Sequence, residues 1–205
     1  SLLMVSCGGG GGGTQPTVIA PVPQVTLTSS DSELLVGNSV TLTWSSSNTT
    51  SCSASGDWSG SKGSSGTESI SVDSAMLLNY TLECTGAGGT ASSSVSVLGY
   101  QEVQGVTVDG YIRSADIFID KNNNFEVDGD ETVTVSDNDG AFVLRYSDGN
   151  LISLGGYDLD TGNLLDNLVL INKLTGYAEF AAITPITTLA SFMETPDDIN
   201  LLLGI

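Results

Sequence analysis

The sequence contains no histidine, and this absence removes several common catalytic chemistries. A Ser-His-Asp triad, a Cys-His pair and a histidine zinc site all require an imidazole, and imidazole is also the commonest general base. Any catalysis would have to use carboxylate, lysine or tyrosine side chains. We therefore expect a protein that is not an enzyme.

Basic residues and long apolar runs are also scarce. Five Lys and Arg stand against 24 Asp and Glu, a net charge of −19, and 18 of the acids lie after residue 100. Such a surface repels phosphate, which argues against nucleic acid as a partner and against binding to anionic lipid headgroups. Because no apolar run is long enough for a bilayer, the sequence predicts no membrane-spanning helix.

Oxygen-bearing side chains are regularly spaced within residues 120–131. Asp, Asn, Asn and Asp occupy the first, third, fifth and ninth positions of this stretch, and a Glu occupies the twelfth. This is the ligand spacing of a twelve-residue calcium loop, whose seventh residue binds through its backbone carbonyl. The alternative is an acidic hairpin turn. We predict a Ca²⁺ site formed by Asp120, Asn122, Asn124, Glu126, Asp128 and Glu131.

Two features distinguish this loop from an EF-hand. Phe125 stands at the sixth position, which is normally Gly because the chain turns sharply there, so we expect an altered bend or weaker binding. The flanking segments, 117–119 and 132–135, are β-branched and aromatic, which predicts strands where an EF-hand has helices. The ion would therefore stabilise a β-hairpin, which favours a structural site over a signalling one.

Short alternating segments dominate residues 24–99. Val40, Leu42 and Trp44 share one face of a predicted strand, and the same period of two recurs at 70–72, 80–84 and 95–97. Strands at this spacing, separated by Ser, Gly and Asn, predict a β-sandwich. Trp44 alternates with aliphatic residues and is expected in the core. Trp58, in a Gly/Ser-rich turn, has a sugar-stacking surface role as its alternative.

The segment "SVTLTWSSSNTTSCSASGDWSG…YTLECTGAGGTASSSVSV" resembles bacterial immunoglobulin-like domains of surface and secreted proteins, over about 70 residues. Three cysteines occur, two in this region and one near the N-terminus, a pattern that suggests one disulfide and one separate thiol. Trp44 stands where antibody-type domains have their first cysteine. The resemblance implies a bridge between Cys52 and Cys84, which would form in the oxidising setting of an exported protein.

The N-terminal Ser-Leu-Leu-Met-Val-Ser-Cys resembles the lipobox of bacterial lipoproteins, with Met4 in place of the usual Leu. The resemblance implies cleavage before Cys7, lipidation of that residue, and attachment to a membrane through its acyl chains at the bacterial outer membrane or cell surface. The alternative is a free cysteine beside a random apolar run. Glycines 8–13 and the following linker to residue 23 predict a flexible tether.

The segment "VDGYIRSADIFIDKNNNFEVDGDETVTVSDNDGAFVLRY" resembles the prealbumin-like B modules of large bacterial adhesins, over about 45 residues. In that family the module is a rigid spacer with a calcium-type loop. Asp137 and Asp139 are expected to form the turn of the hairpin that follows, although they could add oxygens to the ion. The sequence thus predicts an all-β fold of two tandem β-sandwiches, immunoglobulin-like at 24–99 and prealbumin-like at 103–182.

Two further segments, residues 158–162 and the C-terminal region from residue 183, contain recognisable local motifs. Asp158-Leu159-Asp160-Thr161-Gly162 contains the aspartic-protease tripeptide, but one copy would require a symmetric dimer, so a turn or a weak second calcium site is the better interpretation. Thr184-Pro185 predicts a helix start, and Thr195-Pro196 predicts another. This short helical region, 183–205, resembles the opening of a further domain, so we expect the chain to be a fragment at both ends.

Three functions are consistent with these observations. The first is a non-catalytic, lipid-anchored surface protein for adhesion or display, stiffened by calcium and presented to an unidentified protein or glycan ligand. The second is the accessory front half of a secreted or surface hydrolase, because fold alone does not reveal the neighbouring domain. The third is a subunit of a self-assembling surface fibre that associates through sheet edges.

Overall fold

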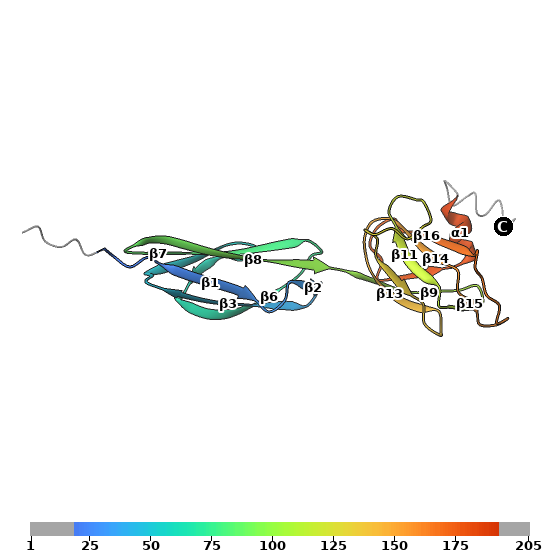
Figure 1. Cartoon of the computed structure of the whole chain (residues 1–205), viewed down its shortest axis with the longest axis horizontal. Helices are drawn as coiled ribbons and strands as arrows, with labels where there is room; N and C mark the ends of the chain where they lie inside the picture. Colours follow the sequence, from blue (N-terminus) through green and yellow to red (C-terminus); the bar gives the residue numbers. More distant parts are fainter. Residues whose placement is uncertain (1–18, 193–205) are drawn as a thin grey trace, which may run out of the picture. The chain divides into compact units, whose positions relative to one another are not determined.

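The computed structural model describes residues 19–192. The predictions for Cys7, for the glycine tether and for the second C-terminal helix fall on residues outside this range. Within it, the chain consists of β-strands and one short helix, which confirms the predicted all-β class (Figure 1). No helix of the described part is both long and apolar enough to cross a bilayer.

The chain forms two compact units, and residues 97–192 belong to the second, together with the segments 31–40 and 71–77. The predicted module limits near residues 99, 103 and 182 are not tested by this division and remain predictions. Each group of sheets is described by itself in the following paragraphs.

Strands β1 to β8 form two sheets that correspond to an immunoglobulin-like sandwich. One sheet has the order β1-β3-β6, and the other has the order β2-β8-β7-β4-β5. Immunoglobulin-like sandwiches divide their strands in this way, with strands from both the start and the end of the domain in each pair of facing sheets. The bounds are β1 (Gln24–Ser29), β2 (Glu33–Leu35), β3 (Ser39–Ser47), β4 (Ser51–Gly56), β5 (Gly60–Lys62), β6 (Ser65–Ser71), β7 (Leu77–Gly86) and β8 (Gly89–Tyr100).

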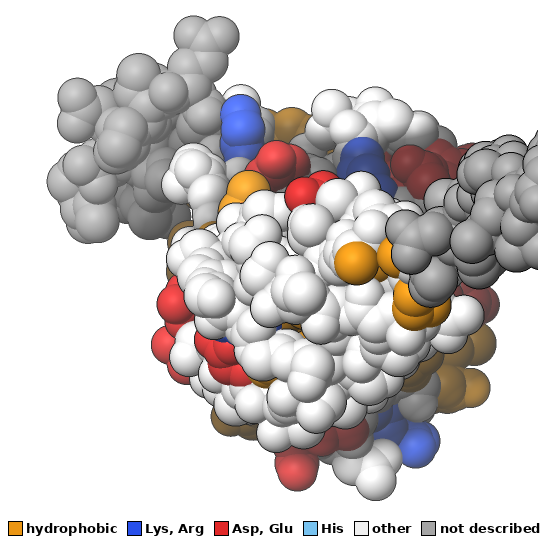
Figure 2. All heavy atoms as spheres, turned by 90° about the vertical axis from the view of Figure 1, so that its left-hand side faces the viewer, with side chains coloured by type: hydrophobic (Ala, Val, Ile, Leu, Met, Phe, Trp, Pro, Cys, Tyr) orange, Lys and Arg blue, Asp and Glu red, His pale blue; other side chains and the backbone are white. Residues whose placement is uncertain are grey.

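The core of this sandwich follows the predicted period of two. Val40, Leu42 and Trp44 of β3 are buried while the intervening threonines are exposed, and β7 buries every second residue from Leu78 to Cys84. Successive strand residues point to opposite faces of a sheet, so one alternating pattern supplies a buried face and a solvated face. In the view of Figure 2, spheres of the backbone and of side chains that are neither hydrophobic nor charged predominate.

Trp58 lies in the core, which argues against the alternative of a sugar-stacking surface role for this residue. Its ring is 6% exposed and makes edge-to-face contacts with Trp44 at 5.6 Å and Tyr80 at 6.4 Å between centroids. Its indole N–H donates to the carbonyl of Thr81 at 3.1 Å. A Gly/Ser-rich turn does not reveal this burial, because the turn folds back over a neighbouring strand of the same sheet.

Strands β9 to β17 form a second pair of sheets around a separate core. One sheet has the order β12-β11-β14-β16, the other has the order β13-β9-β17, and β10 pairs with β15 in a short ribbon (Figure 1). The bounds are β9 (Glu102–Thr107), β10 (Ile112–Arg113), β11 (Asp116–Asp120), β12 (Val133–Val135), β13 (Ala141–Arg145), β14 (Asn150–Leu154), β15 (Tyr157–Asp158), β16 (Val169–Lys173) and β17 (Phe180–Ile183).

Strand β11 is buried on both faces and leads directly into the predicted calcium loop. Ile117 and Ile119 point into the core between the sheets. Phe118 points the other way and forms a smaller cluster with Ile152 and Ile171, its neighbours across the sheet. This double burial holds the end of β11, and therefore Asp120, in a fixed position.

Helix α1 (Pro185–Ser191) begins where the sequence predicted. Thr184 is its N-cap and accepts a hydrogen bond from the backbone N–H of Thr187 at 3.0 Å, with Pro at the first helical position. The helix packs against β16 and β17, and the Thr188 hydroxyl accepts from the N–H of Ile171 at 2.8 Å. The first turn of the predicted helical region is therefore part of the second unit.

Candidate metal centre

The predicted calcium loop connects β11 to β12, and its first residue, Asp120, is completely buried. Asp120 Oδ1 accepts hydrogen bonds from the N–H groups of Asn122 at 3.1 Å and Asn123 at 2.6 Å, and Oδ2 accepts from Phe125 at 3.0 Å. A buried carboxylate is costly unless its oxygens are hydrogen-bonded. Here one side chain organises the first half of the loop.

The same turn is repeated along the loop. Asn122 Oδ1 accepts from the N–H of Asn124 at 3.0 Å, and Asn124 Oδ1 accepts from the N–H of Glu126 at 2.9 Å. The amide groups of both asparagines donate to Asp128 Oδ2, at 2.6 and 2.9 Å. The side-chain oxygens at the first, third and fifth positions therefore accept backbone N–H groups of the turn, and the ninth-position carboxylate closes against the amide nitrogens of the two asparagines.

Glu131 joins the two ends of the loop. Its Oε1 accepts from the N–H of Lys121 at 2.8 Å, and its Oε2 accepts from the N–H of Asp128 at 3.2 Å. Among the described residues, none donates a hydrogen bond to the Glu126 carbonyl, the oxygen predicted to serve as the seventh-position ligand. The two hydrogen bonds of Glu131 turn both of its carboxylate oxygens toward the loop backbone, the side from which a bidentate ligand would bind an ion.

The backbone at Phe125 adopts the left-handed conformation that this position of a calcium loop needs. Its φ is 62°, and φ of Asn123 is also 62°. The expected altered bend is therefore not observed, and the chain turns here despite the Cβ. Such a conformation costs an L-residue about 1–2 kcal/mol.

Replacing Phe125 by glycine is expected to raise the free energy of unfolding of this unit. The left-handed strain disappears, while the greater freedom of glycine in the unfolded chain offsets part of the gain, which leaves about 0.5–1 kcal/mol. Phe125→Ala is the control, because it removes the ring and keeps the Cβ. Differential scanning calorimetry should place the glycine variant above the alanine variant, and equal melting temperatures would contradict the strain.

Sequence reasoning missed three residues that support this loop. Asn150 of β14 donates its side-chain amide to Asn123 Oδ1 at 2.5 Å, which ties the loop to the sheet. Lys121 contacts the Asp130 carbonyl, and its Nζ lies 3.7 Å from Asp130 Oδ2. The sequence could have indicated the role of Asn123, because asparagine tolerates the positive φ of a sharp turn better than most non-glycine residues. The role of Asn150 could not be inferred from the sequence, since it depends on the pairing of β11 with β14.

The donor set determines how well the loop suits a divalent ion. No group of three or more His, Cys, Asp or Glu side chains in residues 19–192 is close enough together to hold a metal. The loop instead combines three carboxylates with two amide oxygens and a backbone carbonyl, and the two asparagine amides surround Asp128. Hard cations such as Ca²⁺ accept this mixture of oxygens. In chemistry and backbone course the residues fit Ca²⁺, provided that the asparagine oxygens turn toward Asp128.

The two other acidic segments form turns. Asp137 Oδ1 accepts from the N–H groups of Asp139 and Ala141, both at 2.8 Å, and Gly140 has φ 72°, as expected for the hairpin. Asp158 accepts from the Thr161 hydroxyl at 2.5 Å and from the N–H of Asp160 at 2.8 Å. The hydrogen bond from the Thr161 side chain, and then that from the Asp160 backbone, lower the pKa of Asp158.

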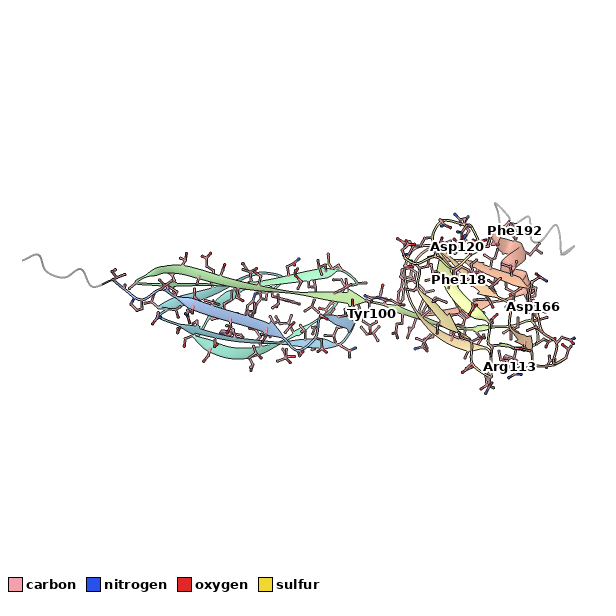
Figure 3. All side chains as sticks on the ribbon, in the orientation of Figure 1. Tyr100, Arg113, Phe118, Asp120, Asp166 and Phe192 are labelled. Carbon is pink, nitrogen blue, oxygen red and sulfur yellow. A yellow bond between two sulfur atoms is a disulfide. The ribbon has the colours of Figure 1, made fainter. Side chains whose placement is uncertain are left out.

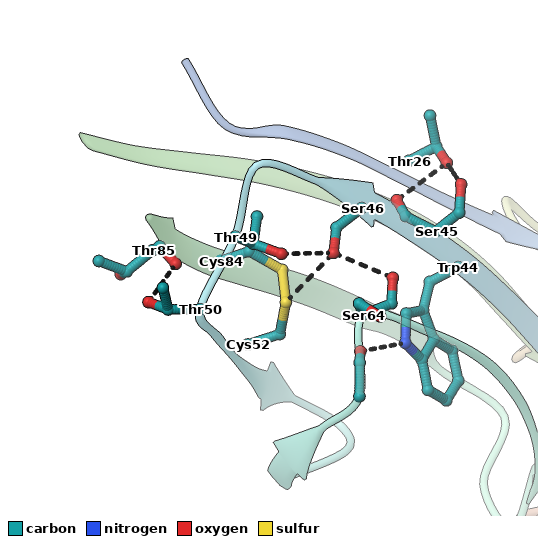
Figure 4. The surroundings of a disulfide bond; sticks show 11 residues. Thr26, Trp44, Ser45, Ser46, Thr49, Thr50, Cys52, Ser64, Cys84 and Thr85 are labelled. Carbon is teal, nitrogen blue, oxygen red and sulfur yellow. Dashed lines mark hydrogen bonds between the residues drawn. A yellow bond between two sulfur atoms is a disulfide. The ribbon is translucent and has the colours of Figure 1, made fainter. Parts of the chain in front are cut away.

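The predicted disulfide is present. Cys52 of β4 and Cys84 of β7 are direct neighbours in the register of one sheet, and their sulfurs are bonded at 2.00 Å (Figure 4). Both side chains are nearly inaccessible to solvent. The bridge therefore links adjacent strands within a layer.

Comparison with known proteins adds little to this geometry. No family model matches the chain, and the search of curated proteins finds no match. Among solved structures, the chain is similar to the fibronectin(III)-like modules of Clostridium thermocellum CbhA, at 12% identity and a TM-score of 0.29, with 83% of this chain and 98% of that chain covered. A likeness this weak carries no functional argument, so the fold assignment rests on the strand order of the chain itself.

Proposed function

We propose that the chain is a non-catalytic surface protein whose second β-sandwich is stiffened by Ca²⁺, and that it serves adhesion or display. The observation that carries this proposal is the loop at 120–131. Asp120 is completely buried at its start, the oxygens of Asn122 and Asn124 accept backbone N–H groups of the turn, and Phe125 takes up the left-handed conformation.

The proposed mechanism is electrostatic. Asp120, Asp128 and Glu131 belong to one short loop, and without an ion the repulsion between their like charges would oppose bringing them together around one site. A divalent ion would remove this repulsion and hold the ends of β11 and β12 together. Since the unfolded chain has no preformed site, the binding energy would add to the stability of the folded unit.

The surface location is the second part of the proposal. The resemblance of residues 1–7 to a lipobox supports a membrane attachment through acyl chains on Cys7, and residues 8–23 would serve as the tether. The disulfide between Cys52 and Cys84 is typical of oxidising compartments such as the cell envelope. Together these features support a stalk that holds a binding surface away from the membrane.

The test is thermal unfolding of the chain in EGTA and in about 2 mM CaCl₂. With a dissociation constant of roughly 0.1–1 mM, typical of extracellular modules, calcium would stabilise the second unit by about 0.6–1.8 kcal/mol. Trp44 lies in β3 and Trp58 in the turn between β4 and β5, so tryptophan fluorescence reports on the first sandwich and should not respond. Calorimetry should show one transition that moves by a few degrees and one that does not.

Glu131→Gln and Glu126→Gln form a matched pair for this experiment. Each removes one charge from the same loop, but only Glu131 offers its carboxylate as a ligand, because Glu126 would bind through its backbone carbonyl. The calcium shift should be lost in Glu131→Gln and kept in Glu126→Gln. Equal responses from the two variants would show that calcium acts through general charge screening, and the proposed site would be wrong.

A further inference from the structure

The short ribbon β10-β15 has an outward face that is largely apolar. Its inward side carries Ile112, which is fully buried in the core. Because side chains alternate across a strand, Arg113 and its partner Tyr157 point outward, and Tyr111 in the preceding turn is exposed beside them. We call this surface the tyrosine–leucine face, and its members are Tyr111, Arg113, Tyr157, Leu159 and Leu164.

The backbone pairing makes this face continuous. Arg113 and Tyr157 are direct partners in the ribbon, and an isolated bridge places Leu164 on the other side of Tyr157. The N–H of Leu159 donates to the Tyr111 carbonyl at 3.1 Å, which brings the remaining two residues together. The guanidinium of Arg113 lies 5.0 Å from the centroid of the Tyr157 ring. The five side chains thus form one surface.

The exposure of this face is unusual for the solvated side of a small sheet. Tyr111 is 52% exposed, Tyr157 38%, Leu159 41% and Leu164 53%. Single exposed apolar residues are common, but adjacent ones that form a patch mark interaction surfaces. Tyr and Arg, moreover, are the residue types that contribute most binding energy when a partner covers them.

Tyr111 has a further property that folding alone does not explain. Its φ is 52°, a left-handed conformation that is costly for an aromatic residue. Its hydroxyl makes no hydrogen bond to another residue of the described part. Asparagine would adopt this backbone more easily, so the half-exposed aromatic ring stands here at a backbone cost that no hydrogen bond of its hydroxyl within the described part offsets.

Carboxylates surround the face. A Cβ atom on Gly110 would lie 2.7 Å from Asp158 Oδ1 and 2.9 Å from Asp160 Oδ2, which places both carboxylates beside the backbone that leads into Tyr111. Asp109 is exposed one residue earlier. The single basic group, Arg113, stacks on Tyr157. The surface therefore combines an apolar centre with an acidic rim.

We propose that the tyrosine–leucine face binds a basic peptide segment that also carries aliphatic side chains. Leu or Val side chains of the partner would cover Leu159, Leu164 and the tyrosine rings. Lys or Arg side chains would reach Asp109 and Asp160 and stack on Tyr111. An apolar centre with charges of one sign around it favours a partner of the opposite charge, and the net charge of −19 opposes a second copy of the same chain.

This inference deepens the proposed display role by naming a partner class, and it rests on that role only for the surface setting. It does not need the ion, because Arg113 and Asp120 lie at opposite ends of the second unit (Figure 3). Binding is therefore measured both in EGTA and in calcium. If the calcium site fails but the face is correct, the peptide still binds equally well in both buffers.

The experiment uses the full chain and a fluorescein-labelled peptide of alternating Lys and Leu, followed by fluorescence anisotropy. Peptides of alternating Glu and Leu and of Lys alone are the controls. The test variant is Tyr111→Asn with Leu159→Ser and Leu164→Ser, all at exposed positions, and asparagine suits the backbone at 111. Val143→Ser, at a 49% exposed site on β13, is the matched control variant.

The Lys-Leu peptide should bind the parent chain and Val143→Ser alike and the triple variant at least about tenfold more weakly. The Lys-only peptide should bind weakly and equally to all three, through charge alone. Unfolding curves establish that the triple variant folds. Equal affinity of parent and triple variant would overturn the proposal, and so would binding of a cello-oligosaccharide at these residues without binding of the Lys-Leu peptide.

Discussion

Replacing Cys52 and Cys84 together by alanine is expected to lower the free energy of unfolding of the first sandwich by about 3–4 kcal/mol. The bridge closes a loop with a sequence separation of 32 residues, and in the chain-entropy model a loop of this size restricts the unfolded chain by about that amount. Urea titration followed by tryptophan fluorescence measures the loss, because Trp44 lies in the surroundings of the bridge (Figure 4) and Trp58 contacts Trp44 in the same core.

The matched control is the neighbouring cross-strand pair, Ser53 and Glu83. These residues are partners in the next register position, and both are exposed on the opposite face of the same two strands. Their double replacement by alanine should change the stability by about 0.5 kcal/mol or less. If the cysteine variant loses no more than this control, the bridge does not stabilise the domain. The parent treated with reductant should match the cysteine variant.

Asp120→Ala is expected to lower the free energy of unfolding of the second unit by about 3 kcal/mol in EGTA. The carboxylate is completely buried and accepts three backbone hydrogen bonds, so its removal leaves the N–H groups of Asn122, Asn123 and Phe125 without their acceptor. Each buried donor without a partner costs about 1–3 kcal/mol, and water entering from the open side of the loop reduces the sum. Calorimetry of the second transition measures this loss.

Two variants separate the structural from the ionic role of Asp120. Asp130→Ala removes an exposed carboxylate from the same loop and should change stability by about 0.5 kcal/mol or less. Asp120→Asn keeps one acceptor oxygen, so it should fall between alanine and the parent in EGTA and still lose the response to calcium. Parent-like stability of Asp120→Ala in EGTA would mean that the loop is not held by this carboxylate.

These two expectations concern different units and different kinds of stabilisation. The disulfide acts chiefly on the unfolded chain, whereas the loop carboxylate acts on the folded one. A combined variant should therefore lose the sum of both effects, each in its own transition. Coupling larger than about 0.5 kcal/mol between the two sites would show that the two parts of the chain unfold together.

Much of the candidate site could be predicted from spacing alone. Asp120, Asn122, Asn124, Asp128 and Glu131 were selected by their intervals, and the structure brings all of them into one loop. For the first half of the loop the intervals suffice because the oxygens of Asp120, Asn122 and Asn124 accept N–H groups of residues that follow closely in the chain, a local interaction. Of the two expected effects of Phe125, the altered bend is not observed, since the strain at one residue is small beside the contacts that hold both ends of the loop, and weaker binding stays a prediction.

The alternating patterns of residues 40–44 and 80–84 determined, without further information, that these segments are strands with one buried face. Only the tertiary structure decided which strands are neighbours. It placed Cys52 opposite Cys84, and it buried the Trp58 side chain against β7 although the residue lies in a turn. It also brought Tyr111 and Leu159 together at the surface. The physical reason is that the side-chain period of a strand is a local property, whereas pairing depends on long-range contacts whose partners the local pattern does not specify.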